Sequence, residues 1–215
     1  EPLEVTASGI TQTTGYTFDV MINYTNLGPA TAYDVNLTVY AVPSTYTTFN
    51  TTFKSCGDLG VNKSCTLGVR VNVLPKTPPI LIVLYGNATW RNPDVTLNTT
   101  VGETDIIVAE NPVIEIVEDE VRKETPHDKT TYVGNITVAS LGNTPVTDIV
   151  LSLTGGNLGT DCPDCAVTLF PNEWGVLDPG ENFTVDITVT VPGGQPPGVY
   201  SVSYTHLTLP TTERV

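Results

Sequence analysis

The chain has 215 residues, with 9 Lys or Arg against 23 Asp or Glu, so its formal net charge is −14. This acidic balance argues against nucleic acid and anionic membrane surfaces as partners, because both attract clustered basic residues. No apolar run is long enough to cross a bilayer as a helix, and no initiator Met or signal peptide is present. We therefore expect a processed N-terminus or a piece of a longer protein.

Apolar and polar residues alternate in segment after segment along the chain, as is typical of strands with one buried and one solvated face. The segment EPLEVTAS (1–8) is interpreted as the first strand of its own domain, with a strand donated to another subunit as the alternative. Alternation continues over 18–24, 35–39 and 183–191, and the apolar run ILIVLY (80–85) predicts a buried strand. The 36 Thr fit this strand-rich reading. No helix of three or more turns is predicted.

The two halves of the chain repeat each other. NLGPATAYDVNLTV (26–39) aligns without a gap with SLGNTPVTDIVLSL (140–153). Downstream, LGVNKSCTLGVRVNV (59–73) aligns with LDPGENFTVDITVTV (177–191). So long a repeat fits tandem domains rather than solenoid units. About seven short strands in each copy, separated by turn residues, predict an all-β chain of two β-sandwiches.

Three phrases carry a family resemblance: N-x-G-x-x-x-A-x-D-V-x-L-T, L-D-P-G-E-N-F-T-V and P-P-G-V-Y-S-V. They resemble immunoglobulin-like cell-adhesion-related repeats, which occur in tandem in bacterial and archaeal surface proteins. The repeat and the turn residues around IVAENPV (107–113) place the two domains at 1–109 and 110–201, and the second is expected to be truncated because nothing after Ser201 matches the first copy. The resemblance implies that both are immunoglobulin-like β-sandwiches. It also implies an extracellular spacer, adhesive or assembly role, and it carries over no catalytic residues.

A sharper resemblance is to glycosylated archaeal surface filaments, whose subunits are paired β-sandwiches. It implies that the partners are neighbouring copies of the chain or other surface proteins, joined by β-strand addition.

Eight Asn-X-Ser/Thr triplets are present, where chance would give about three. The asparagines are Asn23, Asn36, Asn50, Asn62, Asn87, Asn98, Asn135 and Asn182, six of them in the first copy. Several of them sit beside core-facing residues, as Asn36 does between Val35 and Leu37, and so lie on the wet face of their strands. We predict N-linked glycans at these positions, with unmodified polar strand decoration as the alternative.

Four cysteines form one close pair in each copy. We predict disulfides Cys56–Cys65 and Cys162–Cys165, which would place the chain in an oxidising, extracellular compartment. CPDC (162–165) has redox chemistry or half of a zinc site as alternatives. Redox chemistry would need a helix N-terminus and zinc would need further Cys or His, whereas His127 stands alone.

No nucleophile-elbow, zincin, Walker or dinucleotide-binding motif appears, so no catalytic residue, metal or cofactor is predicted. Acidic residues that could suggest glycosidase chemistry or calcium binding are interpreted as solvated turns. These are Glu118, Asp119, Glu120, and Asp178 with Glu181 in a hairpin-type turn.

The leading hypothesis is a non-enzymatic module of a glycosylated cell-surface protein or filament. The alternative is an accessory carbohydrate-binding module of a secreted hydrolase, whose sugar-stacking candidates are Trp90, Trp174, Tyr33, Tyr46 and Tyr132.

The C-terminal stretch VSYTHLTLPT (202–211) is similar to the translation of a transposase-type sequencing adapter. Residues 202–215 are therefore expected to be a non-native tail from an assembled environmental read. His206 and Arg214 are excluded from the functional argument on this ground. Because Val202, Tyr204 and Leu207 are spaced as in a strand, we expect that this stretch can form a strand over 202–208 in place of the missing native one.

Overall fold

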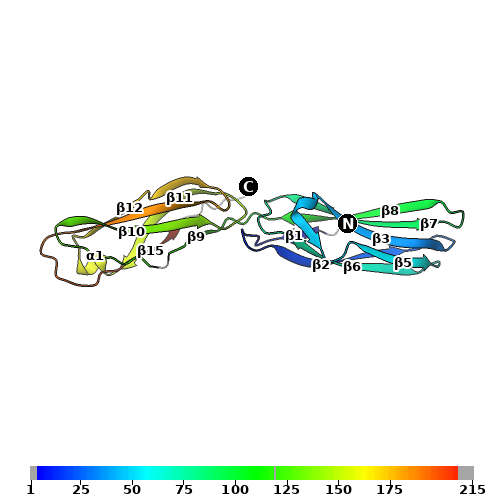
Figure 1. Cartoon of the computed structure of the whole chain (residues 1–215), viewed down its shortest axis with the longest axis horizontal. Coiled ribbons are helices and arrows are strands. Elements are labelled where there is room, and N and C mark those ends of the chain that lie inside the picture. Colours follow the sequence, from blue (N-terminus) through cyan, green and yellow to red (C-terminus); the bar gives the residue numbers. More distant parts are fainter. Residues whose placement is uncertain (1–3, 119, 208–215) are drawn as a thin grey trace. The chain divides into compact units, whose positions relative to one another are not determined.

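The computed structural model describes residues 4–118 and 120–207. They form two compact units that divide between Asn111 and Pro112, two residues after the boundary placed from the sequence (Figure 1). Apart from the 3-10 turn η1 (Ser44–Tyr46) and the one-turn helix α1 (Leu158–Asp161), every regular element in these residues is a strand. The all-β prediction is confirmed. Within the described ranges no helix has the length and apolar character that crossing a bilayer requires.

The first unit is a sandwich of two sheets. Its strands are β1 (Glu4–Ala7), β2 (Tyr16–Thr25), β3 (Ala32–Val42), β4 (Thr47–Phe49), β5 (Phe53–Leu59), β6 (Ser64–Val73), β7 (Leu81–Arg91) and β8 (Leu97–Val108). One sheet has the order β1-β8-β7-β3-β5 and the other the order β2-β6-β4. Leu37 and Ile82 of the larger sheet and Val71 of the smaller one are fully buried between them. The mutual burial of two apolar faces thus holds this unit together.

Strand β7 corrects one prediction. The run ILIVLY was expected to be a buried strand, but only Ile82 and Leu84 are fully buried, while the half-buried Ile80 packs against the core. Leu81 is 51% exposed, and Val83 and Tyr85 are half-buried. The reason is that β7 pairs antiparallel with β3 and β8 in a sheet that has only one covered face, so alternate side chains point outward whatever their polarity.

The second unit has the same two-sheet architecture. Its strands are β9 (Ile114–Ile116), β10 (Lys129–Ser140), β11 (Val146–Gly156), β12 (Ala166–Phe170), β13 (Glu173–Leu177), β14 (Asn182–Val191) and β15 (Val202–Leu207). The sheets have the orders β12-β14-β10-β9 and β13-β11-β15. Ile136, Val138 and Val185 of one sheet pack with Ile149 and Leu177 of the other.

The sequence repeat is visible in detail. Asp34 in β3 and Asp148 in β11 both have left-handed backbones, with φ of 51° and 53°, at equivalent positions of the two copies. The register of β3 shifts next to Asp34 in its pairing with both β5 and β7. Asp tolerates this conformation better than most residues because its short polar side chain can bond locally.

The opening strands of the two units differ. Strand β1 runs parallel to β8 of its own unit, which agrees with EPLEVTAS being a first strand rather than a donated one; residues 1–3 lie outside the described chain. Strand β9 instead runs antiparallel to β10, in the other sheet. The same place in the repeat therefore joins opposite sheets in the two copies.

The turn at Asp178–Glu181 corrects a second expectation. The backbone N–H of Glu181 donates to the carbonyl of Asp178 at 3.0 Å, as in a β-turn. However, β13 before it pairs with β11, whereas β14 after it pairs with β10 and β12. The turn therefore carries the chain from one sheet to the other and does not close a hairpin.

Strand β15 consists of residues that the sequence assigned to a non-native tail. It pairs antiparallel with β11, in the position that β7 occupies beside β3, and the register shifts twice. No strand follows β15 in the described part of the second unit, so β8 has no counterpart there. Residues 208–215, including Arg214, lie outside the described chain, and the origin of this stretch stays a prediction.

Candidate functional site

The eight predicted glycan acceptors all lie at accessible positions. Asn23, Asn50, Asn62, Asn135 and Asn182 are exposed, and Asn36, Asn87 and Asn98 are half-buried. None is enclosed in either core. This distribution leaves room for a modification at each position.

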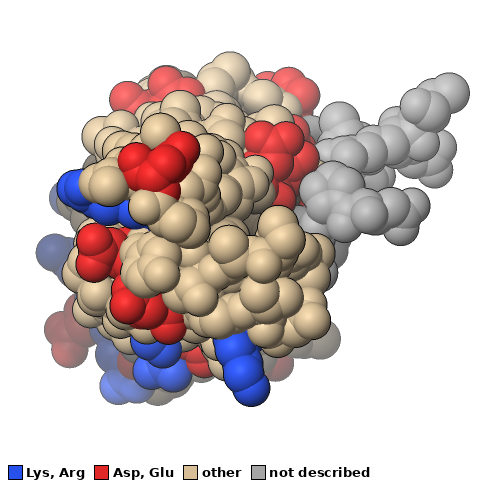
Figure 2. Space-filling model, turned by 90° about the vertical axis from the view of Figure 1, so that its right-hand side faces the viewer, with Lys and Arg blue, Asp and Glu red and all other residues tan. Residues whose placement is uncertain are grey.

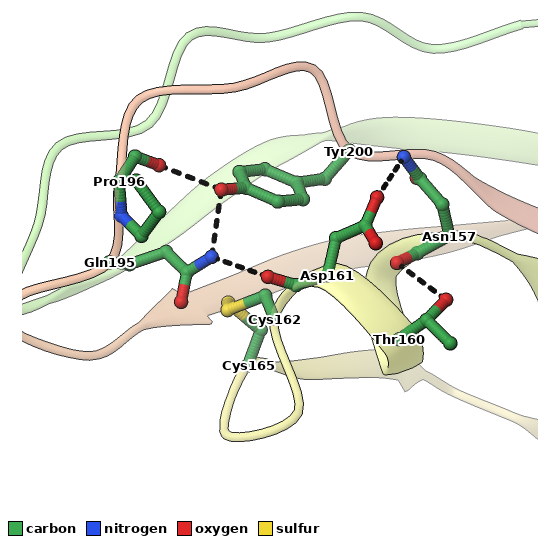
Figure 3. The surroundings of a disulfide bond; sticks show 8 residues. All are labelled: Asn157, Thr160, Asp161, Cys162, Cys165, Gln195, Pro196 and Tyr200. Carbon is green, nitrogen blue, oxygen red and sulfur yellow. Dashed lines mark hydrogen bonds between the residues drawn. A yellow bond between two sulfur atoms is a disulfide. The ribbon is translucent and has the colours of Figure 1, made fainter.

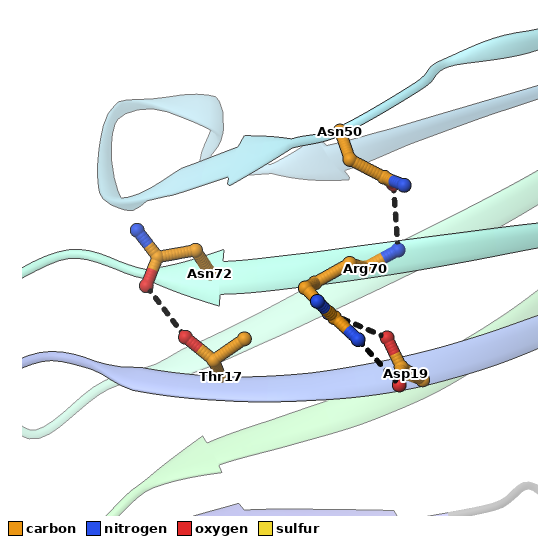
Figure 4. A network of polar contacts seen from close by, with 5 residues as sticks. All are labelled: Thr17, Asp19, Asn50, Arg70 and Asn72. Atoms are coloured by element: carbon orange, nitrogen blue, oxygen red, sulfur yellow. Dashed lines mark hydrogen bonds and ion pairs between the residues drawn. The ribbon is translucent and has the colours of Figure 1, made fainter.

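Asn50 shows how the protein can orient an acceptor amide (Figure 4). The backbone N–H of Arg70 in β6 donates to Asn50 Oδ1 at 2.7 Å, which fixes the oxygen toward the sheet. The Arg70 side chain donates to both carboxylate oxygens of Asp19 in β2, at 3.0 and 3.3 Å. This hydrogen bond lowers the pKa of Asp19 and raises that of Arg70. Asn50 Nδ2, the atom that would carry a glycan, has no protein partner in the described structure.

Two further acceptors share this arrangement. The hydroxyl of Thr66 donates to Asn23 Oδ1 at 3.1 Å, and that of Thr99 donates to Asn87 Oδ1 at 2.7 Å. In both cases Nδ2 is left without a bond among the described residues. Asn36 differs, because its Nδ2 donates to a backbone carbonyl two residues earlier at 3.0 Å. Attachment at Asn36 would have to replace that bond.

The first unit also contains an open cleft of about 540 Å³ beside the edge strand β2. Its lining includes Asn23, Tyr24, Trp90, Asn92, Asn98 and Thr100. Tyr24 of β2 and Trp90 of β7 lie with ring centroids 5.2 Å apart and planes inclined at 34°. Partial burial raises the pKa of Tyr24. The two rings therefore come from different sheets. They form an aromatic pair at the side of the sandwich next to the unpaired edge of β2, which we call the open side.

Asn26 holds the loop that borders this cleft. Its side chain is 5% exposed, and Nδ2 donates to the carbonyls of Ala30 at 2.9 Å and Leu59 at 2.8 Å. Its Oδ1 accepts the backbone N–H of Gly28 at 3.0 Å. All three bonds are to backbone groups, so Asn26 fixes the loop after β2.

The aromatic residues predicted to bind sugar do not gather at one site. Trp174 stacks on Phe183, with centroids 4.6 Å apart, and Tyr46 packs against the core of the first unit. Tyr33 and Tyr132 are exposed and belong to different units. Of these five aromatic residues, Trp90 alone lines the 540 Å³ cleft. Its partner Tyr24 was not predicted, because alternation alone places Tyr24 on the core face of β2.

Both predicted disulfides are present. Cys56 lies in β5 of the larger sheet and Cys65 in β6 of the smaller one, with Cα atoms 6.1 Å apart, so this bond joins the two sheets of the first unit. Cys162 and Cys165, with Cα atoms 5.3 Å apart, close a short loop after α1. Cys162 is the C-terminal cap of α1 rather than an N-terminal residue, and no cysteine in the described chain is free. The arrangement lacks the helix N-terminus that redox activity would need.

The Cys162–Cys165 loop is tied to the segment before β15 (Figure 3). Gln195 Nε2 donates to the carbonyl of Asp161 and to the hydroxyl of Tyr200, both at 2.7 Å. The Tyr200 hydroxyl donates in turn to the carbonyl of Pro196 at 2.7 Å. From the other side, Asn157 Nδ2 donates to the carboxylate of Asp161 at 2.9 Å. These bonds give the loop a structural role.

The acidic residues weighed for catalysis have structural partners or are solvated. The Glu118 carboxylate accepts bonds from the backbone N–H and the hydroxyl of Thr137, and the backbone bond is the main reason that the pKa of Glu118 is lowered. Glu120 pairs with Arg122, and Asp119 lies outside the described chain. Across the described residues, no three His, Cys, Asp or Glu side chains gather as metal ligands would. On the face in Figure 2, acidic side chains are scattered among uncharged ones.

No protein family and no curated protein matches the chain. Several solved structures are similar in architecture. A chain of the CsuC-CsuE chaperone-tip adhesion subunit pre-assembly complex of Acinetobacter baumannii is 11% identical, with a TM-score of 0.45; the match covers 97% of this chain and 98% of that one. The secreted serine protease VesC of Vibrio cholerae is 9% identical, with a TM-score of 0.36 and coverage of 96% and 49%.

The CupB2 chaperone of Pseudomonas aeruginosa is 9% identical, with a TM-score of 0.29 and coverage of 96% and 97%. At such identities and TM-scores, these similarities give no basis for inferring function.

Proposed function

We propose that the chain is a non-enzymatic structural or adhesive module of a glycosylated, extracellular cell-surface protein or filament. The observation that carries this proposal is the accessibility of all eight Asn-X-Ser/Thr asparagines in a fold whose cores exclude them. Glycans at these positions would shield strand edges and turns from proteases. They would require no rearrangement of either core, because each asparagine lies at an accessible position.

The two disulfides support the same setting. Bonds between cysteines persist in oxidising compartments outside the cytosol, and each unit carries its own. The formal charge of −14 favours solubility and discourages nonspecific association with anionic surfaces. Two β-sandwiches on one chain, each crosslinked by its own disulfide, are suited to act as a spacer between a cell and its surroundings.

The proposed partners are further copies of the chain or other surface proteins. Strand β2 hydrogen-bonds only to β6 among the described strands, so its second edge is unpaired. An unpaired edge can accept an added strand in register. Electron microscopy of native material distinguishes a filament subunit from a spacer, since only the former gives regular repeats along a fibre.

Peptide mapping by mass spectrometry of protein from its native source tests the glycosylation. We expect sugar on several of the eight asparagines, with most of it in the first unit, which contains six of them. Bare polypeptide at all eight positions would refute the proposal. Turnover of a substrate by the purified chain would also refute it.

The non-native origin of residues 202–215 remains part of the proposal. Sequencing the source DNA beyond the codon for Ser201 tests it. We expect the natural reading frame to continue there with a different sequence.

A further inference from the structure

Asn98 differs from the other acceptor asparagines in the face on which it lies. In the antiparallel pairing of β7 with β8, Asn98 is directly opposite Trp90, and Thr100 is opposite the buried Ala88. Asn98 therefore lies on the face of the larger sheet that is turned toward the smaller sheet. Opposite residues have Cβ atoms about 4.5–5.5 Å apart. Asn98 Nδ2 donates only a long bond, at 3.5 Å, to the Thr96 carbonyl, and a sugar that replaces it would begin within reach of the Trp90 indole.

The cleft around Trp90 has the chemistry of a carbohydrate site. A pyranose has C–H groups on its ring faces, which are attracted to the negative face of an aromatic ring, and hydroxyls around its rim. The Tyr24–Trp90 pair supplies the aromatic surface. The Tyr24 hydroxyl and Trp90 Nε1 make no hydrogen bond to another described residue, so both are available to a ligand.

The remaining lining favours a neutral polar ligand. Asn92 Nδ2 donates to the Thr96 hydroxyl at 3.2 Å, which leaves its Oδ1 as an acceptor. The Thr100 hydroxyl adds a donor and an acceptor. No charged residue is among those that line the cleft. A purely apolar ligand would bury these polar groups without partners, and a charged one would find no counter-ion.

The space is also adequate. About 540 Å³ falls within the range of about 300–1,000 Å³ that is typical of small-molecule sites. A second cleft of about 340 Å³ shares Asn23, Tyr24 and Thr100 with the first. Gly102 lines this second cleft and leaves it open, because a side chain there would meet nothing within 4 Å, whereas the space beside Gly86 is filled by Ile22. The two clefts together therefore have room for more than one sugar residue.

We propose that the Tyr24–Trp90 cleft is a pyranose-binding site and that its sugar is supplied by an N-linked glycan on Asn98. The supply of the sugar rests on the proposed function, whereas the binding chemistry of the cleft does not. In this arrangement the glycan covers the side of the first sandwich next to β2, so it acts as part of the fold, and it is an alternative to a strand added at that edge of β2.

The test uses Trp90 as its own reporter. Trp174→Phe removes the other Trp of the chain and gives the parent protein. This parent is made in an N-glycosylating host and in one that does not glycosylate, and peptide mass analysis establishes the occupancy of Asn98. Thr100→Ala removes the acceptor triplet of Asn98. Thr89→Ala removes that of Asn87, which lies on the opposite face of the same sheet, and serves as the matched control.

Quenching of Trp90 fluorescence by acrylamide is the readout. In glycosylated protein we expect Thr100→Ala to raise the quenching constant by at least about twofold, because the indole loses its covering sugar. Thr89→Ala should leave it unchanged. Because Thr100 lines the cleft, the change that Thr100→Ala causes in unglycosylated protein is measured separately, and only the excess in glycosylated protein is assigned to the sugar. Occupied Asn98 with equal quenching in all variants would overturn the inference and leave the proposed function standing.

If Asn98 carries no glycan, the sugar cannot come from that position, and a second experiment tests the cleft alone. Unglycosylated parent protein is titrated with N,N′-diacetylchitobiose while Trp90 emission is followed. A saturable shift that Tyr24→Ala abolishes would support the pyranose site and assign its sugar to a free saccharide. No shift in that titration would overturn the inference.

Discussion

Replacing Cys56 and Cys65 together by Ala is expected to lower the free energy of unfolding of the first unit by about 2.6 kcal/mol. The figure follows from the chain entropy that a crosslink between residues nine apart removes from the unfolded state. The matched control is the double replacement of Cys162 and Cys165. Its three-residue separation gives about 1.6 kcal/mol, and it should act on the second unit only.

Each unit contains one Trp, so the two transitions can be followed separately. Trp90 reports on the first unit and Trp174 on the second. Urea unfolding curves of the Trp174→Phe and Trp90→Phe backgrounds, with and without each cysteine pair, give the two free energies. Because removal of the crosslink makes the unfolded state less compact, we also expect the slope of the curve to rise slightly while the midpoint falls.

Two results would refute this reasoning. A loss well below about 1 kcal/mol on removal of Cys56–Cys65 would mean that the unfolded chain is already restricted near this loop. An equal loss in both units would mean that they do not unfold independently. In that case each disulfide would stabilise both units and not only the unit that contains it.

Two further predictions concern single residues. Bonds from Thr137 lower the pKa of Glu118 below its ordinary value of 4.5, so its contribution to stability is present above that value and is lost as the pH falls through the folded-state pKa. Glu118→Gln should therefore lower the free energy of unfolding of the second unit at neutral pH. It should also make that free energy fall less steeply as the pH is lowered, as measured through Trp174; the same pH dependence in the variant and the parent would contradict this. Asn26→Ala should cost the first unit about 3 kcal/mol, because it removes three side-chain-to-backbone hydrogen bonds of about 1 kcal/mol each, and the Trp90 transition should move accordingly. A change below about 1 kcal/mol would show that water replaces those bonds.

Local pattern was sufficient for much of the fold. The alternation predicted over 183–191 is that of β14, where Phe183, Val185, Ile187 and Val191 lie in the core, as a period of two requires. The cysteine pairing followed from closeness in sequence within each copy. These features depend on residues near one another in the chain, which is why the sequence alone was enough to predict them.

What the sequence did not predict depends on pairing between distant segments. Alternation does not say which sheet a strand joins, so the turn after β13 was taken for a hairpin although β14 lies in the other sheet. Alternation also does not show which residues meet at the open side of the sandwich. Asn98 and Trp90 are opposite each other only because β7 and β8 pair in a particular register, and Tyr24 reaches Trp90 from the other sheet.

The parallel pairing of β1 with β8 has a mechanical consequence for a chain held at both ends. Tension applied before β1 and after β8 pulls the two strands in opposite directions along their common axis. The bonds over the four paired positions, from Glu4–Asp105 to Ala7–Val108, then carry the load together instead of parting one at a time. In a surface protein exposed to flow, the first unit should resist extension until this short patch slips as a whole, and pulling single molecules from the two ends would register it as one force peak.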